Sequence, residues 1–279
     1  MDLTNPIPFV EAVQHLLGKG LMPTSLDTVG LRALDAGIRR QAVFSARTLM
    51  TDYLAKIKEV TTSDINPSQE TRIDPDTGES RQVTVGFNPA TARQELRDKL
   101  AALGYAPSDD EAGTITDLAS SERINLVVKT NVELAQGAGN YIAGHDDDVL
   151  DAWPAQELYR QEGRDQPRNW DGRNPQGDKT LTGFGSRWMF AAQASSDADA
   201  ARIMEETGRM IALKSSGIWQ ALGDFEDGLG NPYPPFAFNS GMWVRDVPRK
   251  TAVDLGLIEA GEPAAKPALD IASLFSPKR

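Results

Sequence analysis

Arginines gather around one loop of this sequence, and arginine is well suited to hold a phosphate or a carboxylate group. The loop runs from residue 163 to 185, and Trp170 lies among its basic residues. With the arginine just before the loop, these residues are Arg160, Arg164, Arg168 and Arg173. A guanidinium group binds a carboxylate or phosphate through two parallel hydrogen bonds. The loop could therefore hold an anionic group of a partner, although arginines that only stabilise a loop are more common and we favour that interpretation.

Two acidic segments carry the oxygen ligands that magnesium and calcium prefer. Residues 145–148 (HDDD) are adjacent in the chain, so they converge on one ion only if the loop folds around it. Residues 224–231 (DFEDGLGN) lack the alternating acidic spacing and the terminal glutamate of a calcium-binding loop. We expect ordinary turns at both segments, no metal and no other cofactor.

The sequence offers few side chains for nucleophilic catalysis. It contains no cysteine, which excludes disulfides, a cysteine nucleophile, a thiolate zinc site and an iron–sulfur cluster. Its two histidines, His15 and His145, are too few for a zinc site built on three histidines. The pattern that surrounds a serine nucleophile in hydrolases is absent, and a triad of serine, histidine and acid has few ways to form. We therefore expect no catalytic residues.

The chain is acidic, and its acidic residues are unevenly distributed. Its 279 residues include 29 lysines and arginines against 40 aspartates and glutamates, so the formal net charge is −11. This charge argues against general nucleic-acid binding, which needs a basic surface. Residues 105–151 hold ten acidic and two basic residues and so carry −8 of that charge. We favour a solvated surface that aids solubility, and the alternative is a surface that repels DNA or meets a basic partner.

The apolar residues are sufficient for a globular core but do not form a membrane span. They make up 40% of the chain, and no stretch approaches the roughly 20 apolar residues that cross a bilayer. The first residues lack the basic and apolar regions of a secretory signal. We therefore expect no membrane contact and a protein that stays in the cytoplasm or is packaged from it.

Helical patterns dominate the first half of the chain. We expect helices over residues 8–17, 28–60, 89–103 and 121–144, and a surface hairpin over residues 71–85. The helix over 28–60 is long and has no internal cap, which suggests either a break near Ser45 or an extended helical arm. Asn88 is expected to cap the helix that starts with Pro89. Gly137 and Gly139 interrupt the apolar stripe of the last helix and predict close approach of another backbone.

The second half mixes strands and helices without regular alternation. We expect strands or extended segments over residues 153–160, 209–214, 235–238 and 243–247, and helices over 188–194 and 196–207. This order predicts an α+β protein, with a helical N-terminal region followed by a mixed α+β domain that has a small, mainly antiparallel sheet. The expected segments are 1–62 (helical), 63–106 (hairpin plus helix), 107–258 (α+β domain) and 259–279 (flexible tail). The tail carries a small apolar anchor of Ile271, Leu274 and Phe275.

Three stretches between about residues 40 and 258 share a pattern with one known family. The first stretch runs over residues 123–131 and 136–141, the second over 156–160, 164–165 and 167–170, and the third over 218–219, 234–242 and 244–245. The pattern resembles that of the phage Mu F-like minor head proteins, also called phage head-morphogenesis proteins. The residues that we take as partner-binding candidates from this resemblance are Arg123, Lys129, Asn131, Arg160, Arg164, Arg168, Trp170, Phe236, Phe238 and Asn239.

The chain departs from the family pattern at three positions. Ser240 and Met242 stand where the family often has cysteines, and Asn169 stands near a position where histidine is common. No metal or redox role is therefore carried over to these residues.

The resemblance implies a minor structural component of a phage or prophage head, which acts in capsid assembly near the portal through protein–protein contacts. Its implied partners are the portal protein and the major capsid protein, with packaged DNA close by but not strongly bound. The implied location is the head of the virion and, during assembly, the bacterial cytoplasm.

Two other functions remain as alternatives. The first is an enzyme of transferase or hydrolase type, because related domains lie beside toxin-like modules. It would use Arg123, Arg160 or Arg164 with a carboxylate, and a pocket that joins these arginines to two acids would support it. The second is a scaffold or adaptor protein that is not viral.

Overall fold

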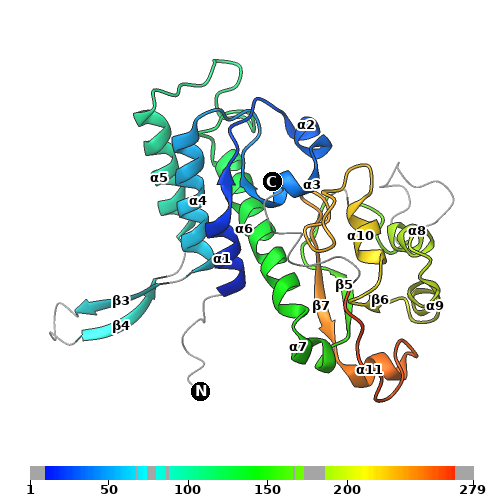
Figure 1. Ribbon diagram of the computed structural model, residues 1–279. Helices are drawn as coiled ribbons and strands as arrows, with labels where there is room; N and C mark the ends of the chain where they lie inside the picture. Colours follow the sequence, from blue (N-terminus) through cyan, green and yellow to red (C-terminus); the bar gives the residue numbers. More distant parts are fainter. Residues whose placement is uncertain are drawn as a thin grey trace. The chain divides into compact units, whose positions relative to one another are not determined.

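The computed structural model describes residues 10–66, 68–73, 80–85, 88–165, 167–172 and 186–267 (Figure 1). Within these residues, eleven helices and a three-stranded antiparallel sheet make an α+β protein, as predicted. Internal contacts divide the chain into unit 1, Met1–Leu31 with Arg39–Gly139, and unit 2, Arg32–Ile38 with Asn140–Arg279. The boundary between Gly139 and Asn140 falls inside helix α6 (Ser121–Gly144). The sequence patterns instead place a segment boundary between residues 106 and 107.

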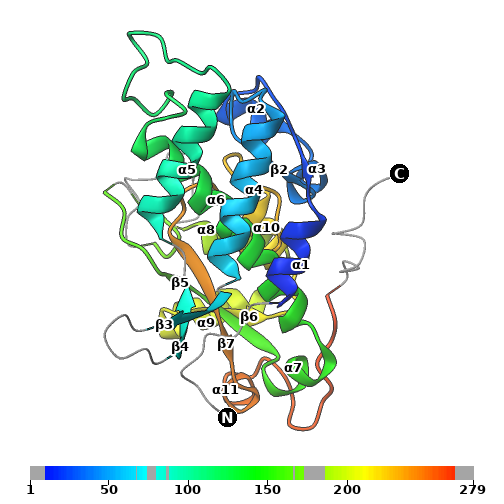
Figure 2. The same cartoon turned by 90° about the vertical axis from the view of Figure 1, so that its left-hand side faces the viewer.

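Unit 1 is built on helices that share one apolar core. Its longer helices are α1 (Val10–Gly18), α4 (Thr51–Ile65), α5 (Pro89–Ala102) and the first part of α6. Helix α4 packs against both α1 and α5, and Figure 2 shows α4 and α5 side by side. The apolar stripe predicted for α6 is largely buried, and its buried members are Ile124, Val127, Val128, Ala135 and Ala138.

Gly139 lets the backbone of α1 approach α6 closely, as the sequence predicts. A Cβ atom at this position would lie 2.6 Å from the backbone nitrogen of Ala12 and 2.8 Å from its Cα atom. Backbone atoms cannot move aside as a flexible side chain can, so glycine is required for this packing.

Of the two alternatives for residues 28–60, the break near Ser45 is confirmed and the extended helical arm is wrong. The chain instead forms α2 (Thr28–Ala33), α3 (Ala36–Arg40), the short strand β2 (Ala42–Val43) and then α4. The side chain of Asp35 accepts a hydrogen bond from the backbone of Gly37 (2.8 Å), which competes with helical bonding between α2 and α3. Strand β2 pairs in parallel with β1 (Gly20–Leu21), a long-range contact that the helical pattern does not reveal.

The predicted hairpin and the helix that follows it are confirmed. Strands β3 (Ser68–Ile73) and β4 (Ser80–Val85) pair antiparallel with Ser68 opposite Val85, and the predicted turn between them lies outside the described residues. Helix α5 begins with Pro89, and the side chain of Asn88 accepts hydrogen bonds from the next backbone amides, at 2.9 Å from Ala90 and 3.3 Å from Thr91. This is the cap that the sequence predicts.

Unit 2 contains the three-stranded sheet, with strand order β6–β5–β7. The strands are β5 (Ala155–Arg160), β6 (Met210–Leu213) and β7 (Met242–Val247), and the helices that follow α6 are α7 (Asp147–Ala152), α8 (Arg187–Ala194), α9 (Ala198–Thr207), α10 (Ile218–Gly223) and α11 (Arg249–Asp254). The three strands and the helices α8 and α9 match the predicted segments. The predicted extended segment over 235–238 is not a strand, because only Ala237 within it forms a bridge, to Gly228.

The expected turn over residues 145–148 is confirmed at His145 and Asp146, directly after α6 ends, and α7 begins at the next residue, Asp147. The side chain of Asp146 accepts a hydrogen bond from the backbone of Asp148 (3.1 Å) and caps α7. Acidic residues suit this position because the N-terminal end of a helix carries a partial positive charge.

The first residues of the predicted tail have specific contacts. Arg249 donates a hydrogen bond to the carbonyl of Glu262 (2.7 Å), and Lys266 forms an ion pair with Asp147 (2.6 Å). Residues 268–279, which contain the predicted apolar anchor, lie outside the described residues.

The pKa of His15 gives a testable pH dependence. Burial on α1, with a smaller contribution from the charge of Lys19, lowers this pKa from 6.5 to about 3. The unfolded chain therefore gains a proton on His15 that the folded chain does not, so the stability decreases as the pH falls from about 6.5 towards 3.

We expect the His15 ring to show no NMR titration between about pH 7 and pH 5, whereas the unfolded protein should titrate near its ordinary pKa. The His15→Gln variant assigns the His15 ring resonance, because this resonance is absent from its spectrum. A His15 ring in the folded protein that titrates near pH 6.5 would contradict the expectation.

Candidate functional site

Two of the candidate residues on α6 are internal to unit 1. The guanidinium of Arg123 is buried and donates hydrogen bonds to the hydroxyl of Ser45 (2.9 Å) and the carbonyl of Ala46 (2.6 Å). The buried amide of Asn131 donates to the carbonyl of Phe44 (3.3 Å). Both residues therefore hold the irregular segment between β2 and α4 against the helix.

Lys129 is the candidate on α6 that the fold leaves half-buried. Its ammonium lies 3.7 Å from the carboxylate of Glu133, one helical turn further along. Such a pair contributes only a few tenths of a kcal/mol, so the fold does not depend on it. Its role in partner binding stays a prediction.

The second and third stretches of the family pattern meet in unit 2. Arg164 donates a hydrogen bond from Nε to the carbonyl of Asn239 (3.1 Å), and Arg168 donates to the carbonyl of Phe238 (3.1 Å). Arg160 donates to the carbonyl of Arg168 itself (3.3 Å). Three of the four arginines in and just before the predicted loop thus bind backbone carbonyls, as the interpretation that they stabilise the loop expects. The fourth, at position 173, lies outside the described residues.

One carboxylate, that of Asp227, joins the arginine loop to α8. It accepts a hydrogen bond from Arg168 Nε (2.5 Å) and two from Arg187, the first residue of α8, at 2.7 and 3.2 Å. Burial by itself raises the pKa of Asp227, but the hydrogen bonds and charges of Arg187 and Arg168 outweigh it and lower the pKa. Asp227 therefore stays ionised and compensates the charge of Arg187, whose side chain is only 2% exposed.

Aromatic rings surround the Arg187 guanidinium. Its central carbon lies 5.2 Å from the ring centroid of Trp170 and 4.7 Å from that of Phe225, within the range of cation–π attraction. Trp170 is fully buried, and its ring centroid lies 6.3 Å from that of Phe236, which is buried as well. Trp170 and Phe236 are therefore core residues of unit 2.

The backbone of the third stretch packs closely against the residues that directly follow β5. The carbonyl of Gly241 accepts hydrogen bonds from the backbone amides of Gln161 (2.9 Å) and Glu162 (3.1 Å). Gly241 has a φ of 66°, and a Cβ atom there would lie 2.6 Å from the carbonyl oxygen of Glu162. Glycine satisfies both constraints. The neighbouring Asn239 stays exposed at the surface.

Arg187 and Asp227 are the two residues of this site that the sequence analysis missed. Asp227 lies in segment 224–231, whose interpretation as a turn is confirmed. Its partners lie 40 and 59 residues away along the chain, and no local pattern links residues so far apart. Asp227 is also one of three acidic residues in this segment, with Asp224 and Glu226, so the sequence does not single it out.

In residues 145–148, which we considered for a metal ion, the side chains contact different parts of the structure and do not converge on one point. His145 is buried, and its Nδ1 lies 2.6 Å from the carbonyl of Tyr141, while Asp146 caps α7 and Asp147 pairs with Lys266. In the part of the chain that the structure describes, no group of three or more histidine or acidic side chains is arranged to hold a metal ion.

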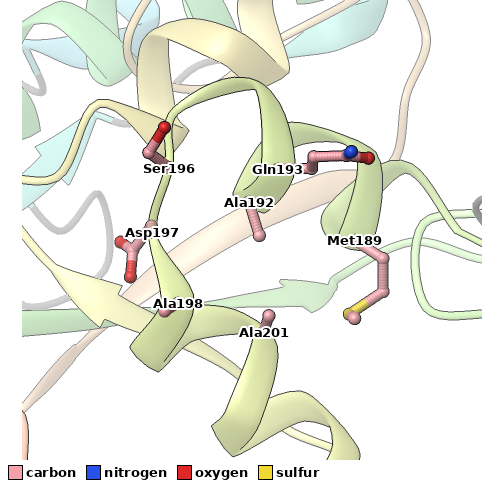
Figure 3. Close-up of a pocket in the computed structure, with 7 residues that line it drawn as sticks. All are labelled: Met189, Ala192, Gln193, Ser196, Asp197, Ala198 and Ala201. Atoms are coloured by element: carbon pink, nitrogen blue, oxygen red, sulfur yellow. The ribbon is translucent and has the colours of Figure 1, made fainter.

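A pocket of about 480 Å³ lies between α8 and α9, away from these arginines. Figure 3 shows Asp197 on one side of it and Met189 on the other, with Ala192 and Ala201 between them. The carboxylate of Asp197 is used to cap α9 and accepts a hydrogen bond from the hydroxyl of Ser216. The pocket therefore brings none of the candidate arginines together with a carboxylate.

Comparison with known proteins identifies no relative: no family model, no curated protein and no solved structure matches the chain. Among the described helices, none combines the length and apolarity that crossing a membrane requires.

Proposed function

We propose that this chain is a minor structural component of a phage or prophage head, which acts in capsid assembly near the portal through contacts with other proteins. The observation that carries the proposal is the contact between the second and third stretches of the head-morphogenesis pattern. Arg164 and Arg168 bind the carbonyls of Asn239 and Phe238, 75 and 70 residues further along the chain. The two stretches thus form one structural unit together with the paired strands β5 and β7, as a family pattern that spans both stretches requires.

The use of the arginines favours a structural role over a transferase or hydrolase role. An enzyme needs reactive groups that face a substrate cavity. Here Arg168 and Arg187 are bonded to Asp227, and Arg164 to a backbone carbonyl and to Glu162 (2.8 Å). Groups that are used in this way hold the fold together.

The candidate residues that stay exposed are available for contacts with the portal and major capsid proteins. Arg160, at the end of β5, and Asn239, in the third stretch, are both exposed. The net charge of −11 is compatible with a place beside packaged DNA without strong binding to it.

The test is assembly with the portal and capsid proteins that the neighbouring genes encode. We expect the chain to co-sediment with heads in a density gradient, and heads made without it to be non-infectious. Arg160→Glu should reduce its incorporation by about tenfold.

The matched control is Lys250→Glu, since Lys250 is 84% exposed and forms only an ordinary helical ion pair with Asp254. We expect no effect of this change on incorporation. A chain that never associates with portals or procapsids, or neighbouring genes that include no portal or terminase, would contradict the proposal.

A further inference from the structure

One face of the sheet in unit 2 carries exposed charged and aromatic side chains that include none of the candidates above. Side chains alternate between the two faces of a strand, so Glu157 and Tyr159 of β5 share a face. Their register partners on β7 are Arg245 and Trp243. Arg209, which precedes β6, bonds to Glu157 from the other side. We call this set the arginine–aromatic face: Glu157, Tyr159, Arg209, Trp243 and Arg245.

The same sheet face is covered at one end and open at the other. Ala155 and Val247, which are register partners, belong to a buried cluster with Ile203 of α9 and Ala252 of α11. At the arginine–aromatic end, the side chain of Arg245 is 60% exposed and that of Arg209 is 41% exposed, and both aromatic residues are half-buried. The exposed end is therefore available to a partner.

The two guanidinium groups are held in place by one buried carboxylate. Arg209 donates to the Oε1 (3.2 Å) and Oε2 (2.7 Å) atoms of Glu157, and Arg245 donates to Oε2 (3.1 Å). The Arg245 guanidinium also lies 5.4 Å from the ring centroid of Tyr159. Burial raises the pKa of Glu157, but its hydrogen bonds to Arg209 and Arg245 outweigh this and lower it. One negative charge thus faces two positive charges, and the cluster keeps a net charge of about +1.

We propose that the arginine–aromatic face binds an acidic peptide segment of a partner protein. A carboxylate of the partner would pair with the exposed edges of Arg209 and Arg245, and an apolar side chain beside it would cover Tyr159 and Trp243. Guanidinium groups that are already fixed lose little conformational entropy when they bind, and they offer paired donors to a carboxylate. The surplus positive charge supplies the complementarity.

A nucleic acid fits this face less well. Arginines and aromatic rings on a sheet also occur in proteins that bind single strands. Such proteins follow the phosphate backbone with a row of cations, whereas here the described residues supply only two cations and they flank a carboxylate. The inference depends on the geometry of the sheet and does not require the head assignment.

The test measures the fluorescence anisotropy of a labelled peptide, in which glutamates alternate with leucine and phenylalanine, on titration with the full chain. A peptide with glutamines in place of the glutamates and a labelled oligothymidylate serve as comparison probes. We expect binding of the acidic peptide, no binding of the neutral one, and a loss of about tenfold in affinity for Arg245→Gln. Lys250→Gln removes the same charge just beyond β7 and should leave the affinity unchanged.

Arg209→Gln is the second variant, in case Arg245→Gln destabilises the sheet, and we expect it to weaken binding of the acidic peptide in the same way. Thermal unfolding of each variant identifies a loss that comes from unfolding. Equal affinity of both arginine variants and the wild type, equal binding of the neutral peptide, or no binding at all would overturn the proposal. Tighter binding of the oligothymidylate than of the peptide, with the same dependence on Arg245, would assign the face to nucleic acid and overturn it too.

Discussion

The Asp227→Asn variant is expected to lose about 3 kcal/mol of unfolding free energy, because removal of one partner leaves a buried charge without compensation. Arg187 would keep its charge at a side chain that is 2% exposed, and Arg168 would lose its bond to α8 through the same carboxylate. Urea denaturation followed by far-UV circular dichroism measures the loss.

Asp224→Asn is the matched control in the same turn. Asp224 accepts an exposed hydrogen bond from Gln220 (2.7 Å), so its change should cost less than about 0.5 kcal/mol. Adding Arg187→Met to Asp227→Asn should restore part of the stability, because the charge without a partner is then absent. Equal losses for Asp227→Asn and Asp224→Asn would contradict the role assigned to Asp227.

The same carboxylate makes the stability depend on pH. The pKa of Asp227 is lowered in the folded state, so its contribution is present above the unfolded pKa and is lost as the pH falls through the folded pKa. Asp227→Asn should therefore flatten the acid side of the stability profile.

The Gly139→Ala variant is expected to lose about 2 kcal/mol, although alanine favours a helix over glycine by about 1 kcal/mol. The added methyl group would meet the backbone nitrogen, the Cα and the Cβ of Ala12 at 2.6 to 2.8 Å, so α1 must move. Chemical denaturation gives the loss, and faster hydrogen exchange in α1 would locate it.

Gly163→Ala is the control for this change. A Cβ atom at Gly163 would have nothing within 4 Å, and its φ lies outside the left-handed region. The Gly163→Ala variant should have the same unfolding free energy as the wild type or a slightly higher one. If Gly139→Ala were as stable as the wild type, the close approach of α1 and α6 would be refuted.

Local patterns predicted much of the fold. The α+β class, the apolar stripe of α6, the Asn88 cap and the strands β5, β6 and β7 each follow from residues that are close in sequence. For residues 28–60 the sequence correctly allowed a break near Ser45, but it did not predict the interruption between α2 and α3 or the strand β2. The side chain of Asp35 accepts a hydrogen bond from the backbone of Gly37, and residues 42–43 pair with the distant strand β1. Both contacts interrupt the helix, even though the apolar residues of this segment have helical spacing.

The candidate site was predicted only in part. The sequence identified the arginine loop and the block around Asn239, and the fold brings these together. It did not reveal that Arg168 and Arg187 share Asp227, because a charge pair formed across 40 or 59 residues leaves no periodic trace. It also placed Arg123 and Asn131 among partner-binding candidates, whereas both are used to hold the segment before α4.

The boundary between Gly139 and Asn140 falls inside α6, near its C-terminal end, and this affects where the chain can be divided into fragments. Proteases need an extended segment, so limited digestion should spare this boundary and cleave in loops elsewhere. A fragment that ends at residue 106 would lack Arg123 and leave the Ala46 carbonyl without its donor. Expression of either half should therefore keep the whole of α6.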